Sequence, residues 1–410
     1  MLDRIRSTRG DSGTGDSRGG RLSRSLSGTN LARAGDYNQR TVLQAIRLAP
    51  GITRVEIAEQ TGLTAPTIAN ITSRLVDLDL IRVTGRRQGG RGQPALRLEV
   101  APDGAFSIGL NIDRDHLSLV VVDLAGSVRS RVTREHAWPL PGDVVAFVRD
   151  ELAPALEAGG VDRSRVLGAG VALPDELGRI ALPHRPATYD QWLDIDPAEL
   201  LAPVLPWPIH TDNDAAAAAL GEAEYGTAFN NPSFVYLLVS AGLGGGVVVD
   251  RSYHRGANAR SGEIGLMPDP TSDRPGAMVQ DTVSLSALLD RLGDVGFTVG
   301  VEQLADLNGA AAAVVDQWLA DAVRSLVQPL IAINCLINPD AVLIGGRLPL
   351  PLIERLAADL NRELENVPLP ARAPVMPADM AQDAPAIGAA ILPLLAHLLP
   401  SDAILIQAGR

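Results

Sequence analysis

A run of glycines between two β-branched stretches is the first feature of the sequence with the chemistry of a binding site. In "VYLLVSAGLGGGVVVD", residues 235–250, glycines stand at positions 242, 244, 245 and 246. The backbone amides of such a loop can form a nest that binds a phosphate or another anion. The same glycines also suit a tight turn between two strands, because glycine permits positive φ and close packing. The pattern leaves both interpretations open.

A second candidate is the arginine-rich segment "LIRVTGRRQGGRGQPALRLEV", residues 80–100, which reads as two strands joined by a loop. Arg86, Arg87 and Arg91 stand among glycines, of which Gly92 is one. Guanidinium groups on so flexible a backbone can follow the phosphates of a nucleic acid or reach into its minor groove. The segment therefore predicts the wing of a DNA-binding domain. A solvated hairpin in an interaction domain is the alternative.

Two short helices before this segment have the signals of a helix-turn-helix. Thr53 and Glu56 fit a capping box, and this helix should end at Gly62. Thr64 fits the N-cap of the next helix, with Pro66 in its first turn and Ile68, Ile71, Leu75 and Leu78 facing inward. The second helix is expected to enter the major groove. We expect DNA contacts from Arg54, Thr64, Ala65, Thr67, Asn70, Arg74, Arg86, Arg87, Arg91 and Gly92.

Charge is divided unevenly along the chain. Residues 1–100 carry 16 Arg against 9 acidic residues, whereas residues 101–410 carry 20 Arg against 39. A basic module on an acidic body is typical of a protein that binds a polyanion. We predict a disordered Arg/Gly/Ser-rich tail over 1–36 and the winged helix-turn-helix domain over 37–100.

After Val100, strands rich in Ile, Val and Leu alternate with helices. Residues 105–128 read as two strands that meet at a polar turn, and residues 211–226 as a strand end followed by an alanine-rich helix. Residues 323–346 read as a long helix, a turn and a strand. This order predicts an α/β body of two lobes with a cleft between them, over residues 101–400.

Taken together, these motifs resemble the ROK family, named for its repressors, open reading frames and sugar kinases, which shares the fold of actin-like ATPases and hexokinases. The resemblance covers residues 38–400 and rests on "GRGQP", "TDNDAAAAALGE", "SAGLGGGVVVD", "RGANARSGEIG", "INPDAVLIGG" and "APAIGAAILPL". It implies that Asn213 binds a sugar and that Asp214 stands where the kinases have their base. It also implies Glu263 as a sugar ligand, with Gln280 near the position of another Glu. An Asp that only caps the alanine-rich helix is the alternative at position 214.

The chain departs from the family's kinases at the first phosphate loop. There "NIDRDH" puts Asn111, Asp113, Arg114 and Asp115 where the kinases have an Asp-x-Gly-Gly-Thr-like turn. Two acids and bulky side chains in a phosphate cradle would repel ATP, so we expect neither ATP binding nor catalysis. Leu266 replaces the zinc-binding His, and residues 268–284 contain no cysteine, so we also expect no metal and no cofactor.

The resulting expectation is a DNA-binding transcriptional regulator, and more specifically a repressor of carbohydrate-related genes, that binds a sugar or sugar derivative in a degenerate kinase-like cleft. Its DNA-binding heads would be spaced by a homodimer or homotetramer. Two alternatives stay open. One is an ATP-dependent sugar kinase with an appended DNA-binding domain, and the other is a regulator that no longer responds to a small molecule.

Neither a signal-peptide pattern nor an apolar run approaching about 20 residues is apparent, so we expect a cytoplasmic protein without a membrane partner. The single cysteine, Cys335, lies in the apolar context "IAINCLINP". This context predicts a buried packing thiol.

Overall fold

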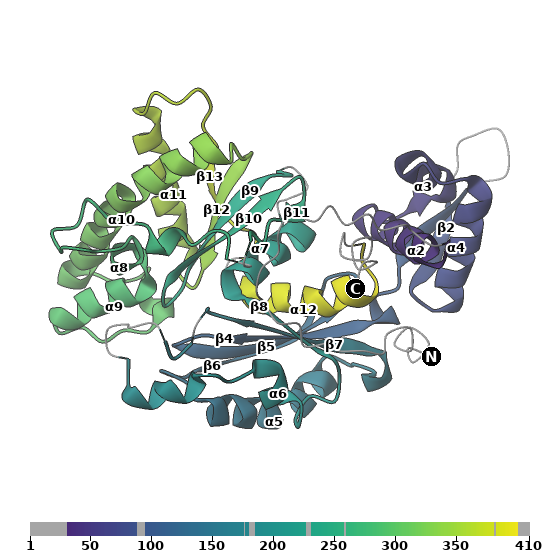
Figure 1. Cartoon of the computed structure of the whole chain (residues 1–410), viewed down its shortest axis with the longest axis horizontal. Helices are drawn as coiled ribbons and strands as arrows, with labels where there is room; N and C mark the ends of the chain where they lie inside the picture. The colour runs from purple at the N-terminus through teal and green to yellow at the C-terminus, as the bar shows by residue number, and fades with distance from the viewer. Residues whose placement is uncertain are drawn as a thin grey trace.

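Three β-sheets organise the chain in the computed structural model, one in a small head and one in each lobe of a larger body (Figure 1). The structure describes residues 31–87, 95–175, 177–179, 185–226, 231–257, 260–380 and 383–400. The predicted class, a winged helix-turn-helix followed by a two-lobed α/β body, is confirmed.

Within the described residues, the head contains three helices and a three-stranded sheet. Its elements are α2 (Leu31–Leu48), β1 (Ile52–Thr53), α3 (Arg54–Thr61), α4 (Ala65–Asp77), β2 (Ile81–Arg87) and β3 (Ala95–Val100), with strand order β1-β3-β2. The capping box of Thr53 and Glu56 is present, and Gly62 ends α3 at a φ of 69°, in the left-handed region that favours glycine. Because α2 already begins at Leu31, residues 31–36 are helical, and the predicted limit of the tail at residue 36 is wrong.

The N-terminal lobe has a five-stranded sheet in the order β6-β5-β4-β7-β8. β4 and β5 form the predicted antiparallel pair, whereas β7 and β8 run parallel to β4. The lobe comprises β4 (Phe106–Ile112), β5 (His116–Asp123), β6 (Val128–Glu135), α5 (Pro141–Ala158), β7 (Val166–Leu173), α6 (Pro197–Leu201) and β8 (Ile209–Asn213). α5 and α6 cover its outer face (Figure 1).

The C-terminal lobe has a second five-stranded sheet in the order β11-β10-β9-β12-β13. β9 and β10 form a hairpin around the glycine-rich segment, and β12 and β13 are parallel to β9. The lobe comprises β9 (Phe234–Val239), β10 (Leu243–Val249), β11 (Ser252–Tyr253), η5 (Ile264–Leu266), α8 (Gln280–Val283), α9 (Leu285–Asp294), α10 (Gly309–Leu336), β12 (Ala341–Gly346), α11 (Leu350–Glu365) and β13 (Val375–Pro377).

Two helices, α7 (Asp214–Tyr225) and α12 (Ala384–His397), lie between the two sheets (Figure 1). α12 packs on the N-terminal sheet, α7 packs on β10, and the two helices pack on each other. A Cβ at Gly388 would overlap the carbonyl group of Ala217, so the helix backbones touch directly. Because the two helices are packed this closely, a displacement of one helix is passed on to the other.

Among the described helices, α10 is the one long and apolar enough to cross a membrane by length and composition. Its apolar side chains, Trp318, Leu326 and Leu330 among them, belong to the core of the C-terminal lobe. Cys335, near the end of α10, is exposed, so the prediction of a buried thiol is wrong. The last turn of this helix leaves the core, which the apolar sequence around Cys335 does not reveal.

Candidate functional site

The start of α7 carries the two residues that the sequence singles out as a sugar and base pair. Asn213 is the N-cap, and its Oδ1 accepts hydrogen bonds from the N–H groups of Ala215 and Ala216, at 2.9 and 3.1 Å. Asp214 is buried, and its Oδ1 accepts from the Ala215 N–H at 2.8 Å. Burial, assisted by the charge of Asp113 and opposed by Arg114, raises the pKa of Asp214 to about 7. Asn213 thus caps α7, and the carboxyl group of Asp214 has a pKa near neutral pH.

Two of the four predicted ligand residues line a cavity, and they line different ones, whereas Asp214 lines neither of these two cavities. The Asn213 cavity, of about 540 Å³, lies at the ends of β7 and β8 and is lined by Leu173, Pro174, Asp175, Leu177, Arg179, Trp192, Asp194, Ile195, Pro197, Thr211, Asp212, Asn213, Arg255 and Arg260. The Gln280 cavity, of about 570 Å³, is lined by Arg114, Asp115, Ala137, Trp138, Ala241, Gly242, Arg274, Gln280, Asp281 and residues of α9. Glu263 precedes η5 and lines neither cavity. The structure therefore does not gather the four predicted residues in one cavity.

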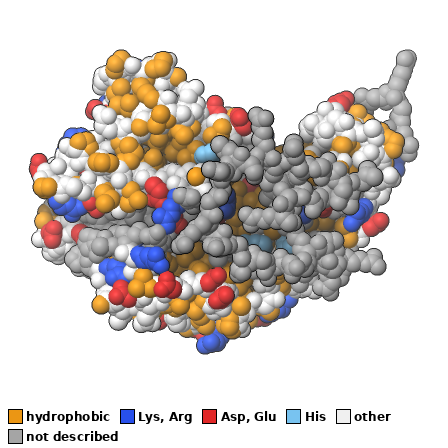
Figure 2. Space-filling model, viewed as in Figure 1, with side chains coloured by type: hydrophobic (Ala, Val, Ile, Leu, Met, Phe, Trp, Pro, Cys, Tyr) orange, Lys and Arg blue, Asp and Glu red, His pale blue; other side chains and the backbone are white. Residues whose placement is uncertain are grey.

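Arginines of the C-terminal lobe reach across the Asn213 cavity to carboxylates of the N-terminal lobe. Arg255 forms an ion pair with Asp212, and Arg260 lies 3.9 Å from Asp175. Burial raises the pKa of Asp212. Figure 2 shows acidic and basic side chains on both sides of the boundary between the lobes. A ligand that enters this cavity meets charged donors and acceptors, which suits a polyhydroxylated molecule.

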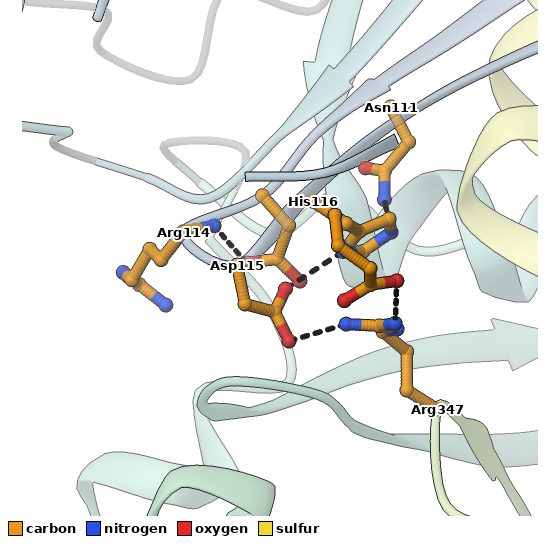
Figure 3. A network of polar contacts seen from close by, with 7 residues as sticks. Asn111, Arg114, Asp115, His116 and Arg347 are labelled. Atoms are coloured by element: carbon orange, nitrogen blue, oxygen red, sulfur yellow. Dashed lines mark hydrogen bonds and ion pairs between the residues drawn. The ribbon is translucent and has the colours of Figure 1, made fainter. Parts of the chain in front are cut away.

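The segment in the place of the first phosphate loop is a tight turn between β4 and β5 filled by its own side chains (Figure 3). Asp113 is 1% exposed, and its Oδ1 accepts from the Arg114 N–H at 2.7 Å. His116 Nδ1 lies 2.7 Å from Asp115 Oδ1, and its Nε2 lies 3.2 Å from Asn111 Nδ2. The polar side chains of this turn thus bind other groups of the same turn.

Arg347, which follows β12 in the other lobe, completes this network. Its guanidinium group donates to Asp115 Oδ2 at 2.6 Å and to Glu135 (Figure 3). Burial opposes a charged His116, but the hydrogen bond to Asp115 and the charges of Asp113 and Asp115 outweigh it and raise the pKa of His116. Burial likewise opposes ionisation of Asp115, and His116 and Arg347 outweigh it and lower the pKa of Asp115. The network is a set of charged groups that compensate one another.

The glycine-rich segment faces an arginine of this same turn. A Cβ at Gly242 would lie 3.2 Å from Nη1 of Arg114. Farther along β10, a Cβ at Gly246 would overlap Ala219 of α7. These contacts support the role of a turn that allows close packing, which was one of the two interpretations of the glycines.

The loop from Met267 to Ser284, where the family resemblance implies a zinc-binding segment, is held by hydrogen bonds. Asp269 accepts from the Thr271 N–H at 3.0 Å and from the hydroxyls of Thr271 and Thr282, both at 2.6 Å. Leu266, at the position of the expected His, is 45% exposed. Within the described residues, Asp113, Asp115 and His116 form one group close enough to share a cation, but both oxygens of Asp115 already bind His116 and Arg347.

The predicted DNA-contacting residues lie mostly on the surface of α4 and β2. Thr64, Ala65, Asn70, Arg74 and Arg86 are exposed, whereas Arg54 and Thr67 are half-buried. Ile68 and Leu75 are fully buried on the opposite face of α4, as predicted, while Ile71 and Leu78 are half-buried. The side chain of Arg87, and residues Arg91 and Gly92, lie outside the described residues.

The head is fixed to the body through α2, which the sequence gave no reason to expect. Arg47 forms a buried ion pair with Glu224 at the end of α7, and its guanidinium carbon lies 4.9 Å from the centroid of the Tyr225 ring. Arg40 Nη1 donates to the carbonyl groups of Leu395 and Ala396 in the last turn of α12, at 3.2 and 3.1 Å. Glu224 is 177 residues from Arg47, and Leu395 is 355 residues from Arg40, so no local pattern reports these contacts.

Comparison with known families gives two matches that divide the chain as its fold does. The model of the ROK family matches residues 107–395, and the model of a winged helix-turn-helix DNA-binding domain matches residues 36–82. The first match spans most of the chain, and the second falls on the head.

Relatives include proteins of both known and unknown function. An uncharacterized protein of Sinorhizobium fredii is 28% identical over 367 residues, which cover 87% of this chain and 90% of that protein. The xylose repressor of Bacillus spizizenii is 25% identical over 233 residues, 56% of this chain and 60% of the repressor's own length.

Solved structures of similar fold include a regulator and an enzyme. A ROK family transcriptional regulator, described as a homologue of the Escherichia coli MLC protein, has a TM-score of 0.64 at 21% identity and covers 92% of this chain and 99% of its own. A ROK family glucokinase from Streptomyces griseus, in complex with glucose and AMPPNP, has a TM-score of 0.56 at 20% identity and covers 70% and 99%. At these identities the likeness concerns the fold.

Proposed function

This chain belongs to the ROK family, and on that premise we propose that it is a cytoplasmic DNA-binding transcriptional regulator, and specifically a repressor that responds to a sugar or sugar derivative. The observation that carries the proposal is the winged helix-turn-helix head, which is fixed by buried contacts to a ROK-type body. The exposed side chains of α4 up to Arg74 are short or basic, which permits close approach to base edges and phosphates. A homodimer or homotetramer of the body would set the spacing of the DNA half-sites.

The route from the sugar to the DNA would run along α7. Its N-cap, Asn213, lines one cavity, and its last turn carries Glu224, which binds Arg47 of the head. A sugar that shifts the two lobes would displace α7, because β10 and α12 pack on it closely. The displacement would then reposition the head, and the two binding equilibria would be coupled.

The proposal excludes catalysis, and the observation that favours this exclusion is the filled phosphate turn. Arg114, Asp115 and Arg347 lie where the resemblance implies the nucleotide phosphates. The carboxylates of Asp113 and Asp115 would repel those phosphates at close range. The second candidate function, a sugar kinase with an appended DNA-binding domain, is favoured by one feature, the carboxyl group of Asp214 with its pKa of about 7, which suits a general base.

A DNA-binding assay tests the proposal directly. We expect Arg74→Ala to weaken binding to a duplex selected from a random library by about 10-fold, because Arg74 is an exposed cation on α4. Fluorescence anisotropy over a series of salt concentrations should show affinity falling steeply as salt rises. Arg355→Ala, which removes a comparable exposed cation from the body, is the control. Absence of DNA binding by the parent chain at any salt concentration would refute the proposal.

A panel of sugars separates the proposal from its two alternatives. With D-xylose, N-acetyl-D-glucosamine and D-glucose in the presence of Mg-ATP, we expect no sugar-dependent ATP consumption in a coupled assay. A sugar that binds the folded state should instead raise the melting temperature. At 100 times its Kd it adds about 3 kcal/mol to the free energy of unfolding. ATP consumption that Asp214→Asn abolishes would establish the kinase. A melting temperature unmoved by an extended panel would favour the ligand-independent regulator.

A further inference from the structure

The residues that fill the phosphate turn also connect the two lobes. Asp115 lies in the β4–β5 turn and Glu135 ends β6, so both belong to the N-terminal lobe. Arg347 directly follows β12 of the C-terminal lobe, and in Figure 3 its side chain reaches the turn from a separate part of the chain. The same guanidinium group donates to both carboxylates.

The position of Arg347 is fixed at its backbone. Its N–H donates to the carbonyl group of Val239 at 2.9 Å, at the end of β9. The residue before it, Gly346, has a φ of 114°, which a residue with a Cβ rarely adopts, and a Cβ there would overlap Val239. This turn holds the arginine against its own sheet, so its ion pairs act on the whole lobe.

The environment makes the Arg347–Asp115 ion pair stronger than an ordinary surface pair, whereas the Glu135 side chain of the second pair is 65% exposed. The Arg347 side chain is 13% exposed and that of Asp115 is 27% exposed, so water screens their attraction only in part. The other oxygen of Asp115 contacts His116 Nδ1, and His116 Nε2 in turn contacts the side chain of Asn111. Once the first carboxylate has fixed the guanidinium group, the bond to the second carboxylate costs little further side-chain freedom.

We propose that Arg347 acts as a latch between the two lobes. Its ion pairs with Asp115 and Glu135 hold the lobes together, so that the cleft closes without a nucleotide. The turn at residues 111–115 thus serves interlobe closure. Any ligand that opens the cleft must break the two ion pairs of Arg347. The latch depends on the fold alone, so it can be tested without DNA, without a sugar and without reference to the proposed function.

Distance measurements in the full chain test the latch. Cys335 is the only cysteine of the chain and is exposed on the C-terminal lobe. With Glu157→Cys, exposed on α5 of the N-terminal lobe, it provides a pair of sites for spin labels. We expect Arg347→Gln to add a longer and broader population to the distance distribution. Arg355→Gln, which removes the Arg355–Asp316 ion pair within the C-terminal lobe, should leave the distribution unchanged.

The pKa of His116, measured by NMR, gives a second readout. The charge of Arg347 repels a protonated His116 and thereby works to lower the pKa of this histidine. Arg347→Gln should therefore raise the pKa of His116, whose resonance is assigned with His116→Gln. Asp113, Asp115 and Glu135 are the acidic groups of this network, and Arg114 and Arg347 its basic ones.

Each result decides the proposal. A longer distance together with a raised pKa supports the latch, whereas an unchanged distance distribution overturns it even if the pKa rises. If Arg347→Gln does not fold, Glu135→Gln, at a side chain that is 65% exposed, removes one arm of the latch and should give a smaller change of the same sign. An unchanged distribution in that variant, in the absence of a folded Arg347→Gln, also overturns the latch.

Discussion

Replacing Glu224 with Gln is expected to release the DNA-binding head from the body. The side chains of Arg47 and Glu224 are 3% and 15% exposed, so the variant leaves a buried guanidinium group without a counter-charge. Breaking a buried ion pair from one side costs about 3–5 kcal/mol, because the remaining charge has lost its solvation and its partner. The contact of Arg47 with the Tyr225 ring compensates only a part of this cost.

Hydrogen exchange on α2 and a thermal scan measure this release. The amides of α2 should lose protection first, and the first unfolding transition should move down by several degrees. The double variant Arg47→Met, Glu224→Leu is the matched test, because an apolar pair of similar volume should recover most of the loss. Wild-type protection of α2 in Glu224→Gln would mean that the apolar contacts of Ile46 and Ile391 fix the head without the ion pair.

The same variant separates DNA binding from its regulation. The exposed residues of α4 do not contact Glu224, so the affinity for DNA without sugar should change little. A sugar that lowers the affinity of the parent for DNA should have a smaller effect on Glu224→Gln, because its signal reaches the head through the end of α7. By linkage, DNA should then also have less effect on the affinity for the sugar.

Local signals in the sequence predicted the parts of the molecule whose causes are local. The capping box at Thr53 and the left-handed Gly62 set the limits of α3, and the stretches rich in Ile, Val and Leu on either side of a turn gave the β4–β5 and β9–β10 hairpins. Family resemblance then supplied the type of fold of the body. The start of α2 was missed because the polar residues before Asn38 lack an apolar period, although they continue the helix.

The residues that contact one another in the site lie far apart in the sequence. Arg347 and Asp115 are 232 residues apart, and neither stands in a motif that names the other. From the sequence, Asp113 and Asp115 indicated only repulsion of ATP, whereas in the structure Asp115 is bound by His116 and Arg347. Asn213, at the start of α7, and Gln280, at the start of α8, likewise line two different cavities, a separation that no local pattern of the sequence reports.

Replacing Asp214 with Asn is expected to stabilise the protein at alkaline pH. The fold raises the pKa of Asp214 from 3.8 to about 7, chiefly by burial, so the folded state keeps a proton that the unfolded state releases near pH 4. Folded protein therefore binds more protons than unfolded protein between about pH 4 and pH 7, and its stability falls as pH rises through this window. Well above pH 7 the cost of the buried charge is fully present, at about 4 kcal/mol.

Urea denaturation at pH 5 and pH 8.5 measures this effect. Asn keeps the oxygen that accepts from the Ala215 N–H but carries no charge, so the variant should match the parent at pH 5 and exceed it at pH 8.5. Asp150→Asn, at a side chain that is 60% exposed, should follow the parent at both values. An equal stability change at both pH values would mean that Asp214 is ionised throughout and held by Arg114. A carboxylate held in that way would be a permanent acceptor for a sugar hydroxyl, whereas a protonated Asp214 can also donate.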